Sequence, residues 1–144
     1  IISMNSKNTT YLTKVFSICA AHQYGNEKWT EQENWDVFGK DTRVHGHNYT
    51  LHVTVTGQVN PDSGFLVDLG HLKKIVNTHV VDVLDHSQFD KDIPWFKGKQ
   101  PSTEVLVTFI WEEITKRLEG CTLHRIRIEE TPTIYTDYYG PIDE

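Results

Sequence analysis

Apolar and polar residues alternate along two stretches of the chain, residues 11–22 and 47–59. Side chains two positions apart on a strand point to the same side, so Phe16, Ile18 and His22 share one face of the first stretch. The second stretch is rich in Thr, Val and Tyr, which favour extended structure. Both stretches are therefore predicted to be β-strands that each turn one face to a core.

Two later segments carry apolar residues at helical spacing. Residues 68–84 are predicted to form a helix with Asp68 as its N-cap. A second helix is predicted to begin near Ser102 and to end before Gly120, a residue that readily closes a helix. The stripes expected to face the core comprise Leu69, Leu72, Ile75, Val76, His79, Val80 and Val83 in the first helix, and Leu106, Phe109, Ile110, Ile114 and Leu118 in the second.

The order of these elements indicates the fold class. A long polar excursion over residues 23–44 separates the first two strands, and a hairpin is predicted over residues 121–130 and 133–139. We predict a single α+β domain over residues 10–144, with a four-stranded antiparallel sheet and two helices on one face. Residues 1–9 are expected to be disordered or a remnant of cloning. The open edges of so small a sheet favour coverage by other copies of the chain.

Composition limits the classes of function. Of the 144 residues, 38% are hydrophobic and 24% are charged, as is usual for one globular domain. The net charge of −6 argues against a nucleic-acid partner, since phosphate backbones are bound by basic surfaces. No apolar run approaches the roughly 20 residues that span a bilayer, so no membrane partner is predicted. Cys19 and Cys121 are too few for a disulfide scaffold, and we expect free thiols in a cytoplasmic protein.

The pair His45 and His47 is the clearest candidate for chemistry. On an extended chain the two imidazoles point to one side, and Gly46 between them allows another backbone to approach. By itself this spacing is a weak signal, because the chain contains eight histidines. His22, however, ends the first strand on its buried face. If the two strands pair with these ends together, three imidazoles meet and leave a fourth position open, which is the pattern of a catalytic Zn²⁺ site.

Several further motifs carry a family resemblance over about residues 10 to 140. They are Ala20-Ala21-His22, Phe38-Gly39-Lys40, His45-Gly46-His47-Asn48-Tyr49, Asn60-Pro61-Asp62-Ser63-Gly64-Phe65-Leu66-Val67-Asp68, Leu84-Asp85-His86, Asp92-Ile93-Pro94-Trp95-Phe96, Pro101-Ser102-Thr103-Glu104 and Glu130-Thr131-Pro132. Through them the chain resembles the 6-pyruvoyltetrahydropterin synthase / 6-carboxytetrahydropterin synthase family. No single motif is decisive, but their joint occurrence in family order is highly specific.

The resemblance implies a tunnelling fold and an assembly. In that family, sheets from three subunits close into a barrel, two trimers stack into a homohexamer, and the active sites lie between subunits. The family's substrate is a small-molecule pterin, 7,8-dihydroneopterin triphosphate, and its metal is Zn²⁺. The expected activity is that of a lyase that breaks carbon–oxygen or carbon–carbon bonds, to 6-pyruvoyltetrahydropterin or 6-carboxytetrahydropterin.

The resemblance also assigns roles to individual residues. Asp85 and His86 match the proton-transfer pair, in which the carboxylate fixes the tautomer of the imidazole. Glu130 matches the pterin anchor, and its parity with Ile126 and Ile128 turns it toward the buried face. A carboxylate there accepts hydrogen bonds from the adjacent amino group and ring N–H of a pterin. The segment that borders the pterin ring matches Ser102, Thr103 and Glu104, although Ser102 is equally explained as a helix cap.

Asp41 departs from the family pattern, because the family carries a cysteine at this position. A carboxylate can also act as a base, although its ordinary pKa of about 3.9 makes it a weak one. The product therefore stays open between the pyruvoyl and carboxy compounds, side-chain cleavage to 6-hydroxymethyl-dihydropterin, and a catalytically weak pterin-binding homologue. Two other classes are kept as alternatives: a non-enzymatic pterin or purine binder with a structural metal, and an unrelated zinc hydrolase that uses Asp41 as its base.

Overall fold

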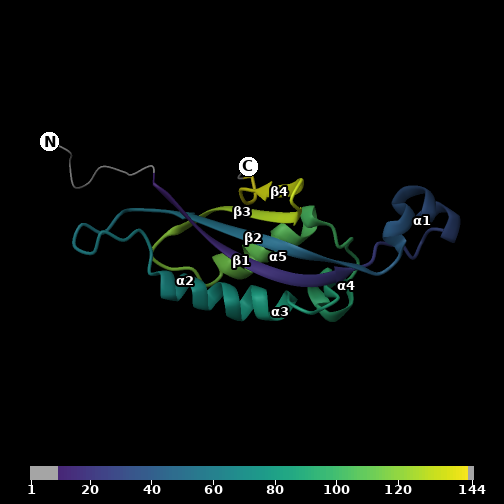
Figure 1. The fold of residues 1–144 in the computed structure, drawn as a ribbon, viewed down its shortest axis with the longest axis horizontal. Coiled ribbons are helices and arrows are strands. Elements are labelled where there is room, and N and C mark those ends of the chain that lie inside the picture. The colour runs from purple at the N-terminus through teal and green to yellow at the C-terminus, as the bar shows by residue number, and fades with distance from the viewer. Residues whose placement is uncertain (1–9, 143–144) are drawn as a thin grey trace.

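A computed structural model of the protein describes residues 10–142 and confirms the predicted sheet. Its four strands are antiparallel in the order β1-β2-β3-β4, so neighbours in the chain are neighbours in space (Figure 1). They are β1 (Tyr11–His22), β2 (His45–Thr56), β3 (Thr122–Thr131) and β4 (Ile134–Tyr138). The second strand starts two residues before the predicted stretch and ends three residues earlier. The expectation for residues 1–9 lies outside the described residues.

Helices cover one face of the sheet, as predicted. In Figure 1, α2 (Leu69–Val76), α3 (Asp82–Leu84) and α5 (Thr103–Thr115) run alongside the strands, whereas α1 (Glu31–Phe38) lies beyond their ends. The remaining helical segments are a short α4 (Phe89–Asp92), a π-helical segment (Asn77–Val81) and 3-10 turns at Gly39–Thr42 and Pro94–Phe96. α5 packs on β3 and β4, while the π segment, α3 and α4 contact β1. No helix within residues 10–142 is long and apolar enough to cross a bilayer.

The core forms because each strand turns alternate side chains toward the helices. Phe16, Ile18 and Ala20 are buried on β1, and His22 continues the same row at the end of the strand. On β2 the buried row consists of alternate residues that include Leu51, and it runs toward the first residues of the strand. Both rows therefore pass from apolar residues into histidines at one end of the core, which places polar chemistry where the sheet stops.

The first predicted helix is interrupted, and this corrects part of its apolar stripe. The π segment uses more residues per turn than an α-helix, so the residues after it rotate back around the axis. As a result Val83, expected to face the core, is 40% exposed, and Leu84 is buried instead at 1%. Leu69, the first residue of α2, is also exposed. Asp68 caps the helix as predicted, because its carboxylate accepts from the backbone N–H groups of Gly70 and His71.

Two neighbouring substitutions test this register. Leu84→Ala is expected to lower the free energy of unfolding by about 2–5 kcal/mol, as is typical of a truncated core side chain. Val83→Ala removes a side chain that is largely in solvent, and we expect a change within about 0.5 kcal/mol. Denaturant unfolding measures both. A larger loss for Val83→Ala than for Leu84→Ala would show that the helix continues without the π segment.

The chain that follows α3 runs along the outer edge of β1. The His86 N–H donates to the carbonyl of Cys19 at 2.5 Å, and the Ala21 N–H donates to the carbonyl of Ser87 at 2.8 Å. A parallel bridge between Ala21 and Gln88 continues this pairing. The segment covers β1 only near its end. Among residues 10–142, no strand pairs with the outer edge of β1 between residues 11 and 17.

Candidate metal centre and active site

The pairing of β1 with β2 brings three imidazoles together, as the sequence predicts. His22 lies directly opposite His45, and Ala20 lies opposite His47. One ring nitrogen of each histidine lies within 4.8 Å of the others. The approach is close because Gly46 has no side chain: a Cβ there would meet the carbonyl oxygen of Ala20 at 3.2 Å.

Hydrogen bonds to the backbone fix how two of these rings present their nitrogens. The Nδ1 of His22 lies 2.7 Å from the carbonyl oxygen of Pro101, and the Nδ1 of His45 lies 2.9 Å from that of Arg43. Because a carbonyl only accepts, both Nδ1 atoms carry the hydrogen and both Nε2 atoms keep a lone pair. These two Nε2 atoms are only 3.0 Å apart, a contact between two lone pairs that a shared cation would relieve. Such carbonyl support of the outer nitrogen is the usual arrangement around metal-ligating histidines.

The third histidine supports the same conclusion. The Nε2 of His47 is buried and has no hydrogen-bond partner among residues 10–142. Its nearest charged neighbour is the Oε1 of Glu130 at 3.1 Å. A buried nitrogen without a partner is costly unless something occupies the space in front of it. The three residues therefore fit a divalent cation with nitrogen ligands, and Zn²⁺ is the commonest metal for a three-histidine site with an open position.

Burial lowers the pKa of His22 below its ordinary value of 6.5. Desolvation is the largest cause; the neighbouring His45 and His47 add to it, while the carbonyl of Pro101 and the carboxylate of Glu130 oppose it. The folded protein therefore favours the neutral imidazole, which is the form that binds a metal.

This lowered pKa predicts how the stability of the metal-free protein depends on pH. Below pH 6.5 the unfolded chain binds a proton at His22 more readily than the folded chain does. The free energy of unfolding is therefore expected to fall as the pH drops below about 6.5, and to be recovered above it. Thermal melts of chelator-treated protein across this range measure the effect. His22→Gln, whose amide does not titrate, should show a shallower slope, and an unchanged slope would contradict the assignment.

Two carboxylates flank the histidines on different sides. The Oε1 of Glu130 lies 3.9 Å from the Nε2 of His22, in addition to its contact with His47. The Oδ1 of Asp41 lies 3.6 Å from the Nε2 of His45, and its side chain is 60% exposed. Thus the structure brings both predicted residues to the three histidines: Glu130 from β3, and Asp41 from the 3-10 turn before β2.

The beginning of α5 forms another wall near the site. Ser102 caps the helix by accepting from the backbone N–H of Val105 at 3.2 Å, so the helix-cap explanation of this residue is confirmed. The buried hydroxyl of Thr103 donates to Glu104 at 2.9 Å and lies 2.9 Å from the hydroxyl of Thr136. These residues follow Pro101, whose carbonyl holds His22, and this connects the segment to the metal centre.

Asp85 and His86 form the expected pair, but they lie away from the three histidines. The Oδ2 of Asp85 accepts from the Nδ1 of His86 at 2.7 Å, and its Oδ1 accepts from the backbone N–H of Cys19 at 2.7 Å. The bond from Cys19 is the main cause that lowers the pKa of Asp85, followed by that from His86. Within residues 10–142, no hydrogen bond or ion pair joins this pair to the three histidines. His86 is 81% exposed and has a left-handed φ of 61°, which is uncommon for a residue with a side chain.

The sequence interpretation missed Tyr24, which also borders the centre. Its ring centroid lies 5.1 Å from that of His22 and 5.4 Å from that of Phe38, and its backbone N–H donates to the carbonyl of Asp41 at 3.0 Å. Burial, then the charges of Glu130, Glu104 and Asp41, raise the pKa of Tyr24 to about 12. The available signal was its spacing, because Tyr24 follows His22 by two residues and so stays on the same face if the chain remains extended.

The sequence interpretation also missed Tyr49, although the same signal was available: Tyr49 follows His47 by two residues on β2. It is only 1% exposed, and its ring centroid lies 5.5 Å from that of His47. Burial raises the pKa of Tyr49, and the charge of Glu130 and the neighbouring Tyr24 add to this. Its hydroxyl has no hydrogen-bond partner among the described residues.

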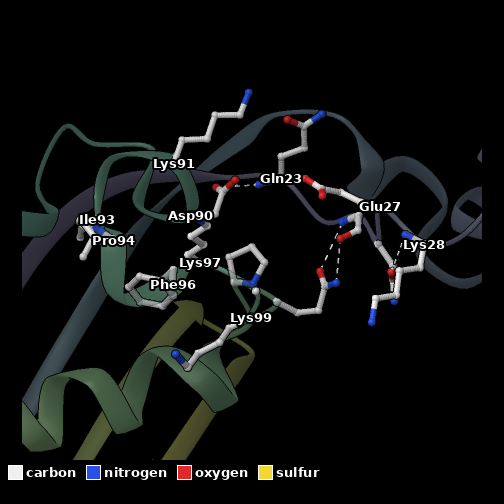
Figure 2. A pocket seen from close by; sticks show the side chains of 15 residues that line it. Gln23, Glu27, Lys28, Asp90, Lys91, Ile93, Pro94, Phe96, Lys97 and Lys99 are labelled. Carbon is white, nitrogen blue, oxygen red and sulfur yellow. Dashed lines mark hydrogen bonds between the residues drawn. The ribbon is translucent and has the colours of Figure 1, made fainter.

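A separate cavity of about 710 Å³ lies behind His22. Gln23 and Pro101 belong to its wall, and the Gln23 N–H donates to the Oδ1 of Asp90 at 3.2 Å (Figure 2). None of the predicted catalytic, substrate-binding or metal-ligating residues lines it, although Ile93, Pro94, Phe96 and Pro101 of the family motifs do. Pro101 holds the Nδ1 of His22, so the cavity lies on the opposite side of the imidazole from the Nε2 that faces the other histidines. The metal centre and this cavity are therefore distinct.

Comparisons with known proteins agree on one family. The family model of 6-pyruvoyl tetrahydropterin synthase matches residues 11–141. A 6-pyruvoyl tetrahydrobiopterin synthase from Poecilia reticulata is 36% identical over 132 residues, which cover 90% of each chain. A 6-carboxy-5,6,7,8-tetrahydropterin synthase from Bacillus subtilis (strain 168) is 35% identical over 133 residues, covering 88% of this chain and 83% of that one.

A solved structure extends this agreement to the fold. The 6-pyruvoyl tetrahydropterin synthase of Caenorhabditis elegans superposes with a TM-score of 0.86 at 34% identity, covering 92% of this chain and 96% of that one. Sequence and structure thus coincide over nearly all of the described residues. The chain belongs to the 6-pyruvoyl tetrahydropterin synthase family, with its tunnelling fold, and is a synthase-like lyase of pterin biosynthesis.

Proposed function

We propose that the protein is a Zn²⁺-dependent lyase acting on 7,8-dihydroneopterin triphosphate. The observation that carries this proposal is the meeting of three imidazoles whose free nitrogens face one point, with the carboxylate of Glu130 beside them. The substrate comes from the family resemblance, and the metal comes from the donor set. We also expect a cytoplasmic location, in keeping with the free thiols of Cys19 and Cys121.

His22, His45 and His47 would hold the metal, and the carbonyls of Pro101 and Arg43 keep two of the rings in place. When bound, Zn²⁺ acts as a Lewis acid toward the hydroxyl groups of the substrate side chain and stabilises the negative charge that develops on proton removal. The low exposure of His22 excludes water from one side of this centre.

Glu130 would orient the pterin ring. A carboxylate accepts two parallel hydrogen bonds from the amino group and the ring N–H, which fixes the ring in one plane. Thr103 and Glu104 stand at the start of α5 and would border the same ring. With the ring anchored here, the substrate side chain reaches toward the histidines that Glu130 already contacts.

Asp85 and His86 would move protons at the site of a neighbouring copy. Asp85 accepts from the Nδ1 of His86, which leaves Nε2 free to take or give a proton on the exposed side of the ring. Within one copy the pair lies on the outer edge of β1. An assembly in which β4 of one copy pairs with the uncovered edge of β1 of the next would form the barrel of the family. Two such trimers would give a homohexamer with active sites between subunits.

Mixing two inactive variants tests this shared site. His47→Ala lacks a metal ligand but keeps the Asp85–His86 pair, whereas His86→Ala keeps all three metal ligands. If the subunits are unfolded and refolded together, activity is expected to return, because some sites combine intact parts from two copies. Mixing His47→Ala with His45→Ala is the matched control and should restore nothing. Mixed oligomers that form without regaining activity would contradict the shared site.

Asp41 would be the base that distinguishes this chain from its relatives. Its carboxylate lies beside His45 and is open to solvent, so it can reach a proton on a bound side chain. The product is 6-pyruvoyltetrahydropterin or 6-carboxytetrahydropterin; side-chain cleavage to 6-hydroxymethyl-dihydropterin is the alternative that the Asp41 carboxylate favours. The same carboxylate favours the second candidate function, a zinc hydrolase in which Asp41 serves as base.

Product analysis tests the proposal. Zinc-loaded protein is incubated with 7,8-dihydroneopterin triphosphate under reducing conditions, and the ring products are identified by mass. We expect conversion to one of the three named pterins, and we expect Asp41→Cys to shift the product toward the pyruvoyl or carboxy compound. Retention of unchanged substrate, with pterin bound but not turned over, would favour the non-enzymatic binder. Hydrolysis of ester or amide substrates without pterin turnover would favour the hydrolase.

A further inference from the structure

Two tyrosines, Tyr24 and Tyr49, pack against the histidines beside the candidate pterin anchor. Tyr49 faces Glu130 across the sheet, because Thr50 pairs with Glu129 and the register places the two residues on the next rung. The ring centroid of Tyr49 also lies 5.5 Å from that of His47, which Glu130 contacts at 3.1 Å. The hydroxyl of Tyr49 has no hydrogen-bond partner among residues 10–142.

Tyr24 is the one of the two that a ligand can reach. Its ring is held between His22 and Phe38, and its backbone is tied to Asp41, so its hydroxyl has a fixed position. The side chain is half-buried, whereas the hydroxyl of Tyr49 is closed off from solvent. Tyr24 therefore lies at the surface of the site, and Tyr49 stands behind it.

Carboxylates line the site beside Tyr24. The carboxylate of Glu130 lies 3.9 Å from the Nε2 of His22, whose ring packs on Tyr24, and the carboxylate of Asp41 lies 3.6 Å from the Nε2 of His45. Carboxylates accept hydrogen bonds but do not donate them, and the Nε2 atoms of the supported histidines are acceptors as well. A ligand that carries an oxygen acceptor needs a donor among these groups, and a phenol provides one.

We propose that Tyr24 is a specificity-determining residue whose hydroxyl donates to the carbonyl oxygen of the pterin ring. This inference rests on the proposed function. The edge of a 2-amino-4-oxo ring presents an amino donor, an N–H donor and a carbonyl acceptor in a row. Glu130 accepts from the two donors, and Tyr24, whose ring packs on His22 beside Glu130, donates to the acceptor. The site thereby recognises all three polar groups on this edge of the ring, rather than the two donors alone.

A ring with sulfur in place of this oxygen isolates the contact. The 4-thioxo counterpart of pterin keeps the amino group and the ring N–H, but sulfur is a weak acceptor. Binding of both rings to zinc-loaded protein is measured by calorimetry for wild type and Tyr24→Phe. We expect Tyr24→Phe to bind pterin about tenfold more weakly, as for one lost hydrogen bond, and to bind the thioxo ring as wild type does.

The outcomes separate this inference from the proposed function. Tyr11→Phe, at the far end of β1, is the matched control and should bind both rings as wild type does. Zinc content and melting temperature of Tyr24→Phe should equal those of wild type, since the phenyl ring keeps the packing. Equal binding of pterin by Tyr24→Phe and wild type, or an equal loss for both rings, would overturn the role of Tyr24 and leave the proposed function standing. Failure of wild type to bind pterin would overturn both.

Discussion

His47→Ala is expected to abolish the metal centre while leaving the fold intact. The Nε2 of His47 is buried and makes no hydrogen bond among the described residues, although the Oε1 of Glu130 lies 3.1 Å away, so its removal would cost a metal ligand without breaking an internal hydrogen bond. Because losing a mere support of a ligand already weakens metal binding about 10–100-fold, losing the ligand itself should exceed about a hundredfold. Elemental analysis should show the loss of zinc after dialysis, together with lyase activity near background.

The control for this prediction is a histidine of the same strand on the other face. His52 pairs with Glu129 at 3.0 Å and lies away from the three ligands. His52→Ala should keep the zinc content of wild type. Chelation of wild type should reproduce the inactivity of His47→Ala, and re-addition of zinc should restore only the wild type. Retention of full zinc by His47→Ala would remove this residue from the ligand set.

Glu130→Gln is expected to give the largest loss of pterin binding. The amide is the same size but presents one acceptor and one donor, so it loses one hydrogen bond and opposes a ring donor with its own N–H groups. Charge-assisted hydrogen bonds contribute roughly 1.5–3 kcal/mol each, so the dissociation constant should rise by about a hundredfold or more. Equilibrium titration with a pterin, followed by its fluorescence, provides the measurement.

Glu129→Gln is the matched control for this change. The two glutamates are consecutive on β3 but point to opposite faces, and Glu129 contacts His52 instead of the metal centre. Its substitution should leave pterin binding unchanged. Equal losses for the two variants would indicate that the charge of the strand, rather than the position of Glu130, governs binding.

The period-two pattern of the strands explains why the metal centre could be predicted. His22 lies on the buried face with Ile18 and Ala20, and the pairing of β1 with β2 then places it opposite His45. Parity also separated Glu130 from Glu129 correctly. These inferences depend only on alternation along single strands, which the sequence displays directly.

Other features depend on contacts between distant segments, and the sequence pattern does not display them. The π segment moves Leu84 into the core in place of Val83, although both fit an apolar stripe equally well. The separation of Asp85 and His86 from the three histidines follows from how the chain after α3 runs along β1. A motif states which residues belong together in a family, but it does not state whether one copy of the chain brings them together.

The missing side chain at Gly46 has a consequence for the precision of the metal centre. A methyl group added at Gly46 would lie so close to the Ala20 carbonyl oxygen that the backbone at Ala20 would have to move by a few tenths of an ångström. Metal–ligand distances tolerate deviations of only about 0.2 Å. The spacing between the two backbones therefore limits how closely the three imidazoles approach one another, although Gly46 itself offers no ligand atom.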